Sequence, residues 1–420
     1  MQGEEIDGRT DASTAGPWSP LRIKVFRGLW VAALVSNVGT FMHLVAAGWA
    51  MTSLTSSPVL ISLVQTSWAV PGFLLALHAG AFADLVDRRR LIIATQVAAL
   101  VVAAALGIMQ WVGAMSVWGL LAGTFLESVA LTIAAPAFMA LTPELVDTQR
   151  LAQAIGLDAI SRNIAQSLGP ALAGAVIALT NTGAVFALNA VSFVGVVMVV
   201  YGYRPAHAPT RSTKDEGGGE WNRAIAEGVR LVSGTHQLRN IAVRLTLVML
   251  CTSVLTAVMP VVARSKLGVS AGGFGLLLGA LGVGSVLAIQ VLPALRSRWS
   301  LEVIALRAAV LWAAGASAVA IGSHLWVALI ALVVAGVGSM AMLNVLFSTF
   351  TMQLPTHARG RGSSLAMLMV WLGASLGAAV WGSVASAAGV DAALWWSAGA
   401  MVVAAAVAAV ALPIVSTPTG

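Results

Sequence analysis

Charged residues are absent from long stretches of this sequence and cluster between them. Residues 28–83 contain no Asp, Glu, Lys or Arg, and similar uncharged runs recur to the end of the chain. A soluble fold could not hide so many apolar side chains, because much of any folded surface must meet water. The composition, 59% hydrophobic and 9% charged, agrees with this reading. We therefore predict an integral membrane protein that crosses the bilayer many times.

The uncharged runs have the length of membrane-spanning helices. A hydrocarbon core about 30 Å thick requires about 20 apolar residues per helix. Barrel strands are excluded because their alternating pattern would not give such continuous apolar runs. Division at charges and at Gly, Pro and Asn clusters gives twelve expected spans. They are 28–54, 58–82, 90–112, 116–141, 153–179, 183–203, 241–263, 270–294, 301–322, 325–350, 361–387 and 390–412.

A polar segment separates the spans into two groups of six. The expected organisation is an N-terminal tail (1–27), a six-helix bundle (28–203), a linker (204–240), a second six-helix bundle (241–412) and a C-terminal tail (413–420). Within the linker, residues 221–232 carry an apolar stripe opposite charged residues. This pattern predicts either an amphipathic helix on the membrane surface or a solvated linker helix.

The two groups of spans also resemble each other in sequence. "SLGPALAGAV" at 167–176 matches "SLGAAVWGSV" at 375–384, and "FMALTPELVDTQ" at 138–149 matches "FTMQLPTHARGR" at 350–361. Repeats in the same orientation are related by an axis along the membrane normal, as in major facilitator transporters. The sequence thus predicts an all-α membrane protein with two pseudo-symmetric six-helix bundles.

Positive charges orient the chain in the membrane. With both termini in the cytoplasm, that side collects most loop Lys and Arg residues, whereas Arg264 and Lys266 lie on the opposite side. This bias fits the positive-inside rule and a multi-pass protein of the plasma (inner) membrane. The polar start of the chain lacks the apolar core of a signal peptide, so we expect a cytoplasmic tail. The net charge of +7 is spread over many loops and does not indicate nucleic-acid binding.

Several kinds of chemistry are not expected from the residues present. The single cysteine, Cys251, excludes an internal disulfide and a cysteine-built metal site. The six histidines form no pair at metal-ligand spacing, and no P-loop occurs. We therefore expect no metal, no cofactor and no enzymatic activity. A receptor or intramembrane enzyme would need a sensory domain or a catalytic set, and neither is recognisable.

The stretch "GAFADLVDRRR" at 80–90 carries the most specific resemblance to a known family. It resembles the loop between spans two and three of the major facilitator superfamily, which reads Gly, three residues, Asp-Arg, one residue, Gly-Arg-Arg. The matching residues are Gly80, Asp84, Arg88, Arg89 and Arg90, whereas Leu85 and Asp87 depart from the pattern. The resemblance implies a conformational latch in which Asp84 approaches Arg359 and Arg361 at the start of span eleven.

A second resemblance lies in span five. "AQSLGPALAG" at 165–174 is similar to the Gly-Pro motif of the superfamily's antiporters and keeps Gly169, Pro170 and Gly174. Together with "PAFMALTPELV", it resembles the branch of transmembrane secretion effectors that contains the enterobactin exporter and the macrolide efflux pumps. Small residues at steps of four would let a neighbouring helix approach closely, which is also the ordinary packing explanation of this motif.

Charged residues inside the spans are the candidates for coupling transport to protons. An intramembrane charge is costly and needs a function or a partner. Glu127 lies near the middle of span four, and Asp158 and Arg162 lie one turn apart in span five with Gln166 one turn further. Glu127 is the preferred proton carrier, and Asp158 with Arg162 forms a gate, a substrate-cation site or a structural ion pair. The superfamily's usual arginine in span four is replaced, by rough alignment, at Thr124.

Polar residues elsewhere in the spans either line a central cavity or bond to a neighbouring helix. They are Asn37, His43, Gln65, Gln166, Asn189 and Asn344. The resemblance implies a monomeric secondary transporter that exports hydrophobic or amphipathic small molecules, such as drugs, antibiotics or siderophores, against an inward flow of protons. The alternative on the same fold is an importer or facilitator of a small metabolite.

Overall fold

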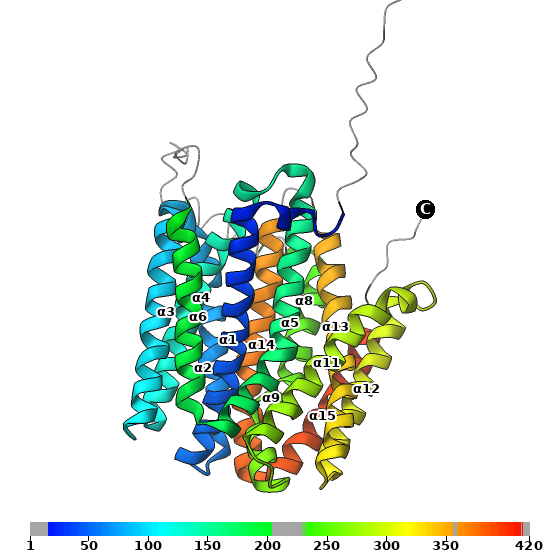
Figure 1. Cartoon of the computed structure of the whole chain (residues 1–420). Helices are drawn as coiled ribbons and strands as arrows, with labels where there is room; N and C mark the ends of the chain where they lie inside the picture. The colour runs from blue at the N-terminus through cyan, green and yellow to red at the C-terminus, as the bar shows by residue number, and fades with distance from the viewer. Residues whose placement is uncertain (1–15, 204–229, 231, 356–358, 413, 415–420) are drawn as a thin grey trace, which may run out of the picture.

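The structure is a computed structural model that describes residues 16–203, 230, 232–355, 359–412 and 414. It is a bundle of long helices that run side by side from one end of the molecule to the other (Figure 1). The first six long helices are α1 (Lys24–Leu54), α2 (Pro58–Leu85), α3 (Arg88–Trp111), α4 (Val117–Leu145), α5 (Leu151–Leu179) and α6 (Thr182–Gly202). The later ones are α8 (His236–Thr252), α11 (Ala271–Arg296), α12 (Leu301–Ile321), α13 (Leu325–Gln353), α14 (Arg359–Ala388) and α15 (Val390–Ala411). Short 3-10 turns, η1 (Ser19–Arg22) and η2 (Thr148–Arg150), precede α1 and α5.

The seventh span is interrupted near its far end. After α8, the chain continues through α9 (Val254–Ala257), α10 (Met259–Val261) and the π-helical turn η3 (Val262–Lys266). Pro260 lies within this broken stretch and has no backbone N–H to offer to the helix. The π-turn at its end widens the helix and carries Arg264, which is exposed, and Lys266, which pairs with Asp391 at the start of α15.

The helices agree closely with the spans expected from the sequence. Eleven helical stretches in the described part of the chain are long and apolar enough to cross a membrane. The twelfth, α5, has 29 residues but carries several polar side chains, which lower its mean hydropathy. The all-helical fold is therefore confirmed. The amphipathic helix expected at 221–232 lies largely outside the described residues.

The helices pack mainly within two groups, α1–α6 and α8–α15. Two extensive helix pairs join these halves: α2 packs against α14, and α5 packs against α11. These helices are the second and eleventh spans and the fifth and eighth spans. The two pairs are therefore equivalent under the repeat detected in the sequence.

The two halves are in contact at the end where α1 finishes, which we call the distal end. The opposite end, where α1 begins and α15 finishes, is the terminal end and lies at the top of Figure 1. At the distal end, the rings of Trp49 and Phe274 stack with centroids 5.7 Å apart. Arg264 Nη1 donates to the hydroxyls of Thr52 and Ser53, each at 2.8 Å. Both contacts join the halves, so this end of the bundle is closed.

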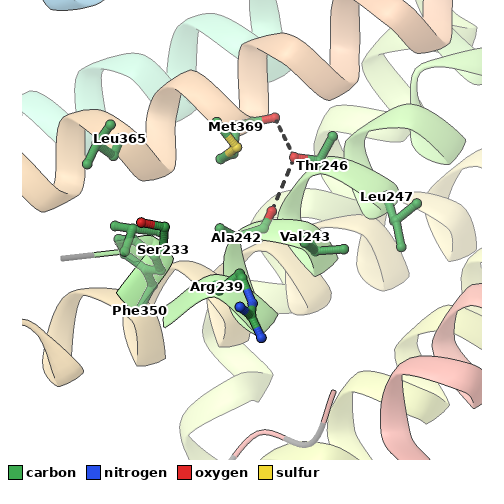
Figure 2. Close-up of a pocket in the computed structure, with 10 residues that line it drawn as sticks. Ser233, Arg239, Ala242, Val243, Thr246, Leu247, Phe350, Leu365 and Met369 are labelled. Carbon is green, nitrogen blue, oxygen red and sulfur yellow. Dashed lines mark hydrogen bonds between the residues drawn. The ribbon is translucent and has the colours of Figure 1, made fainter. Parts of the chain in front are cut away.

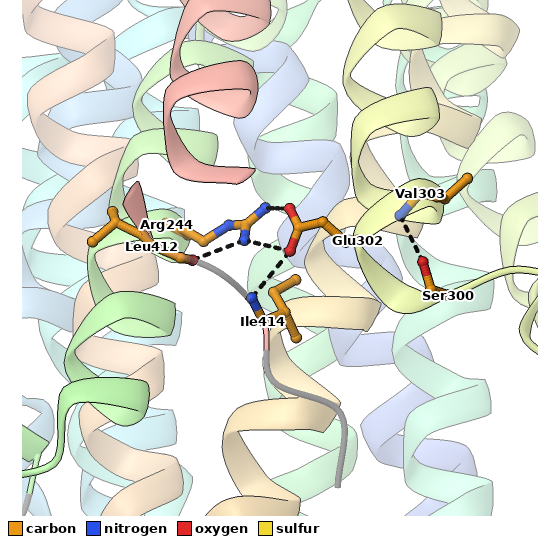
Figure 3. A network of polar contacts seen from close by, with 6 residues as sticks. All are labelled: Arg244, Ser300, Glu302, Val303, Leu412 and Ile414. Carbon is orange, nitrogen blue, oxygen red and sulfur yellow. Dashed lines mark hydrogen bonds and ion pairs between the residues drawn. The ribbon is translucent and has the colours of Figure 1, made fainter. Parts of the chain in front are cut away.

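A buried ion pair holds the C-terminal half together near the terminal end (Figure 3). Arg244 of α8 donates to both carboxylate oxygens of Glu302 at the start of α12, at 2.6 and 3.0 Å. Arg244 also donates to the carbonyl of Leu412 at 3.1 Å, and the amide of Ile414 donates to Glu302 at 3.0 Å. The network therefore fixes the segment after α15 to two other helices.

Candidate functional site

A sealed cluster of polar side chains lies inside the N-terminal half. His43 of α1, Glu127 of α4 and Asn189 of α6 are all 0% exposed. Asn189 Nδ2 donates to Glu127 Oε1 at 2.8 Å, and Glu127 Oε2 lies 3.1 Å from His43 Nδ1. The other imidazole nitrogen of His43 lies 3.4 Å from the hydroxyl of Thr124. Three helices thus bring two titratable groups together in an apolar environment.

The contact between the carboxyl group and the imidazole is close but poorly aligned. His43 Nδ1 and Glu127 Oε2 are 3.1 Å apart, yet neither atom makes a hydrogen bond of acceptable geometry among the described residues. A buried polar atom without a partner is costly, so a small rotation that aligns the two is favourable. The pair is suited to sharing one proton, because a charged carboxylate without compensation is expensive at this depth.

Small and aromatic residues explain why the cluster forms here. Gly39 of α1 faces α6, and a Cβ at this position would lie 2.8 Å from both Asn189 Oδ1 and Ser192 Oγ. The glycine therefore lets α6 approach closely enough for Asn189 to reach Glu127. The ring of Phe186 packs against His43, with centroids 5.0 Å apart, and excludes water from that side.

His43 and Asn189 are accordingly not part of an open cavity lining in this conformation. The structure places both in the sealed cluster with Glu127. Sequence reasoning identified all three residues but gave no signal that they meet, because they come from three different spans. It also did not anticipate that Thr124 would contact the imidazole.

Asp158 and Arg162 do not form an ion pair in the described part of the chain. Asp158 is half-buried and its Oδ2 accepts a hydrogen bond from Thr142 of α4 at 3.4 Å. Arg162 and Gln166 are exposed. The two charges still interact electrostatically, and which of the three explanations applies stays a prediction.

The exposed side of α5 ends about halfway along the helix. Ile155, Arg162 and Gln166 are exposed, whereas Ala173 and Ile177, further along the same side, are 0% and 8% exposed. Because α5 is one of the two helices of the N-terminal half that pack on the other half, the gap beside it separates the halves. The bundle is therefore open toward the terminal end and closed toward the distal end.

The small residues of span five allow close helix packing. Gly169 faces α1, where a Cβ would lie 2.7 Å from Phe41 Cβ. Gly174 faces α11, where a Cβ would lie 2.9 Å from Gly275 Cα. Pro170 between them is buried. The motif therefore lies at the junction of the two halves, and its relation to antiport stays a prediction.

The conformational latch expected from the resemblance is described only in part. Gly80 and Asp84 in α2, and Arg359 and Arg361 in α14, lie outside the residues whose side chains the structure describes. The following arginines have partners within the N-terminal half. Arg88 pairs with Glu144 of α4, and Arg89 donates to the carbonyls of Val200, at 2.9 Å, and Tyr201.

One of the two residues that depart from the superfamily pattern, Asp87, has a local explanation. Asp87 caps the start of α3, where its carboxylate accepts from the backbone amide of Arg90 at 2.8 Å. Arg88 and Arg89 therefore tie the start of α3 to α4 and α6.

The remaining polar candidates are largely engaged with neighbouring helices. Asn37 donates to Ser161 of α5 at 3.3 Å. Asn344 of α13 accepts from Arg296 of α11 at 3.0 Å. Gln65 is half-buried on α2. Interhelical bonding therefore accounts for Asn37 and Asn344 as the structure stands.

A pocket of about 340 Å³ lies within the C-terminal half, between α8, α13 and α14 (Figure 2). The hydroxyl of Thr246 bridges the carbonyls of Ala242 and Met369 along one side. Arg239 is its charged lining residue. The other lining residues are Val232, Ser233, Val243, Leu247, Phe350 and Leu365. Because this pocket belongs to one half only, motion of one half against the other would not open and close it.

Comparison with known proteins identifies relatives among membrane transporters. Residues 15–417 match the model of a family described as transmembrane secretion effectors. The chain is 24% identical to the staphyloferrin A transporter of Staphylococcus aureus over 61% of this chain and 64% of that protein. It is 22% identical to macrolide efflux protein A of Streptococcus pyogenes over 39% of this chain and 40% of that protein. The matched regions therefore span less than two thirds of both relatives.

The fold has a close counterpart among solved structures. A bacterial homologue of the human lysosomal transporter Spinster, in an inward-facing and occupied conformation, superposes with a TM-score of 0.77 at 15% identity. The superposition covers 95% of this chain and 99% of that chain. At this level of identity the likeness concerns the fold.

Proposed function

Because the chain belongs to the transmembrane secretion effector family of major facilitator transporters, we propose that it exports hydrophobic or amphipathic small molecules in exchange for protons. It is a multi-pass membrane transporter rather than an enzyme. Direction, coupling ion and substrate class are the proposed part. The name of one relative, a macrolide efflux protein, supports export, and the other is named as a transporter of staphyloferrin A.

Alternating access provides the mechanism. The two halves meet at the distal end through Arg264 and the stacked rings, and they part beside α5 toward the terminal end. With the terminal end in the cytoplasm, as the positive-inside rule predicts, this is an inward-facing state. Rocking of the halves about the α2–α14 and α5–α11 pairs would break the distal contacts and expose the site to the outside.

The observation that carries proton coupling is the sealed pair formed by Glu127 and His43. Two titratable groups 3.1 Å apart, fully buried in the membrane interior, can hold one proton at much lower cost than a separated charge. They come from different helices, α1 and α4, so a rearrangement of these helices would change both their distance and their access to water. Uptake of the proton from one side and release to the other would then follow the transport cycle.

The experiment is transport into proteoliposomes with an imposed proton gradient. Candidate substrates come from an export screen of macrolides, siderophores and dyes in a host without its own pumps. We expect substrate flux and opposite proton flux in wild type, and loss of both in Glu127→Gln. The matched control is Asp147→Asn just after the same helix, which removes an exposed carboxylate outside the sealed cluster and should retain both fluxes.

Two results would contradict the proposal. If a gradient drives no exchange and Glu127→Gln transports as wild type does, proton coupling through this residue is wrong. If substrate moves together with protons rather than against them, the protein is an importer, which was the alternative on this fold.

A further inference from the structure

We propose that Arg162 and Gln166 form the substrate-binding site for amphipathic anions, with a carboxylate or phosphate head group on Arg162 and the apolar portion alongside in the gap between the halves. This inference rests on the proposed transport function and narrows its substrate class. It follows from the position of the two side chains on α5, from the absence of an ion pair at Arg162 in the described structure, and from the charge of the surrounding surface.

Three sides of α5 have other partners. With about 3.6 residues per turn, side chains three or four apart share a side of a helix. Toward α1 the helix presents Ser161, Ala165 and Gly169, and toward α11 it presents Pro170 and Gly174. Toward lipid it presents Leu168 and Leu172, which are 52% and 46% exposed.

The fourth side of α5 carries Arg162 and Gln166. It lies between the α1 side and the α11 side and away from the leucines, so it faces the gap between the halves. Exposure on this side ends beyond Gln166, because Ala173 is 0% exposed. A ligand that enters from the terminal end would therefore meet Arg162 within about one helical turn of the deepest accessible point.

The hydrogen-bond donors of Arg162 are available to a ligand. Asp158 is one turn away and its charge acts on Arg162, but its carboxylate accepts from Thr142, and the described residues show no ion pair between the two. A guanidinium offers a planar fork of donors that fits a carboxylate or phosphate in bidentate fashion. Gln166 adds an amide one turn deeper, and Ile155, which is 56% exposed, adds apolar surface.

The surrounding charges favour an anion as well. Basic side chains at the terminal end, such as Arg27, Arg296 and Arg298, are exposed. A positive mouth raises the local concentration of anions and speeds their entry. A cation would instead approach an exposed guanidinium, and such like-charge contact is unfavourable where water is restricted.

Asp158 can take the place of the substrate when the site is empty. Side chains at positions i and i+4 are neighbours on a helix surface. A change of rotamer would bring the carboxylate of Asp158 from Thr142 to Arg162, so that the guanidinium is not left uncompensated when the gap closes. Exchange between Asp158 and the substrate anion would then allow the empty transporter to complete its cycle.

Equilibrium binding in lipid nanodiscs tests the inference without any gradient. The probes are a dansylated alkanoate and the matching alkyl phosphate, alkanol and alkylammonium, detected by energy transfer from the tryptophans. We expect wild type to bind one or both anions more tightly than the alkanol, and the alkylammonium most weakly. Arg162→Gln should weaken anion binding about ten- to hundredfold, as expected for loss of charged hydrogen bonds, without affecting the alkanol.

Two variants serve as controls. Arg162→Lys should recover part of the preference for anions, because the charge remains while the bidentate fork is lost. Arg307→Gln removes one charge from α12, where the guanidinium lies over the ring of Trp299, and it should change anion affinity less than about twofold.

The inference is overturned if the alkylammonium binds as tightly as the anions, or if Arg162→Gln binds the anions as wild type does. The assay is independent of proton coupling. Anion binding without proton-driven flux would retain the binding site and refute only the proposed antiport. Proton-driven flux together with unchanged anion binding in Arg162→Gln would retain the proposed antiport and refute only the binding site.

Discussion

The ion pair between Arg244 and Glu302 allows a quantitative prediction about stability. The side chain of Arg244 is 5% exposed and that of Glu302 is 22% exposed. Removal of one partner from a buried pair leaves the other charge uncompensated, and the cost depends on how well water can reach it. The two single alanine variants should therefore differ, because the two charges differ in exposure.

Glu302→Ala should be the more damaging change. It leaves the buried guanidinium of Arg244 with one described acceptor, the carbonyl of Leu412, and it removes the acceptor of the Ile414 amide. We expect a loss of about 4 kcal/mol in the free energy of unfolding. Arg244→Ala leaves a carboxylate that water reaches and that keeps the Ile414 amide, so we expect about 2 kcal/mol. The double variant Arg244→Met with Glu302→Leu should lie within about 1 kcal/mol of wild type.

The measurement is unfolding by titration with SDS in mixed micelles, followed by tryptophan fluorescence, with the same lipid for all four proteins. The expected order of stability is wild type and the double variant first, then Arg244→Ala, then Glu302→Ala. The reasoning is refuted if Arg244→Ala is the less stable single variant, or if the double variant is as unstable as Glu302→Ala.

Three further predictions concern motion and packing. Arg264→Ala should raise the ratio of outward-open to inward-open protein about fivefold, because two hydrogen bonds across the distal end are lost. Distance measurements between spin labels on the two halves would detect this change, and an unchanged distance distribution would contradict a gating role. Gly174→Val should destabilise the protein by about 1–3 kcal/mol, because the new side chain would meet the backbone of α11, whereas Gly156→Ala should be neutral or slightly stabilising, because a Cβ there has nothing within 4 Å. Equal midpoints of SDS unfolding for the two variants would refute this packing argument. Asp84→Asn should impair transport but not membrane insertion, because its carboxylate is expected to stabilise the start of α14 in one state; normal transport would remove the latch.

The position of each span was predictable because the signal is local. A helix in lipid must satisfy its own backbone, so the apolar run alone marks its course, and α3 at Arg88–Trp111 lies within two residues of the predicted 90–112. The break in the seventh span was not predicted, although Pro260 and the nearby charges of Arg264 and Lys266 were visible. Apolar content hides the loss of regular hydrogen bonding there, since the broken stretch is as hydrophobic as the helix before it.

The candidate site was predictable as a set of residues but not as an arrangement. Glu127 was singled out because an isolated acid in a span is costly. Its partners on α1 and α6 are far from it in the sequence, and nothing in their own spans distinguishes them from other polar residues. The spacing of Asp158 and Arg162 indicated an ion pair, whereas among the described residues Asp158 accepts from Thr142 on a neighbouring helix and acts on Arg162 only through its charge.

The sequence by itself determined that the protein lies in a lipid bilayer, where its helices run along the chain, and that the two halves are duplicated. These properties follow from local chemistry, because every backbone N–H and C=O group in the bilayer must be hydrogen-bonded within its own helix, whichever helices lie next to it. The tertiary structure decided which buried charges meet, which remain exposed, and which end of the bundle is closed. These depend on contacts between helices such as α1, α5 and α6, which small residues like Gly39 and Gly169 allow to approach each other closely.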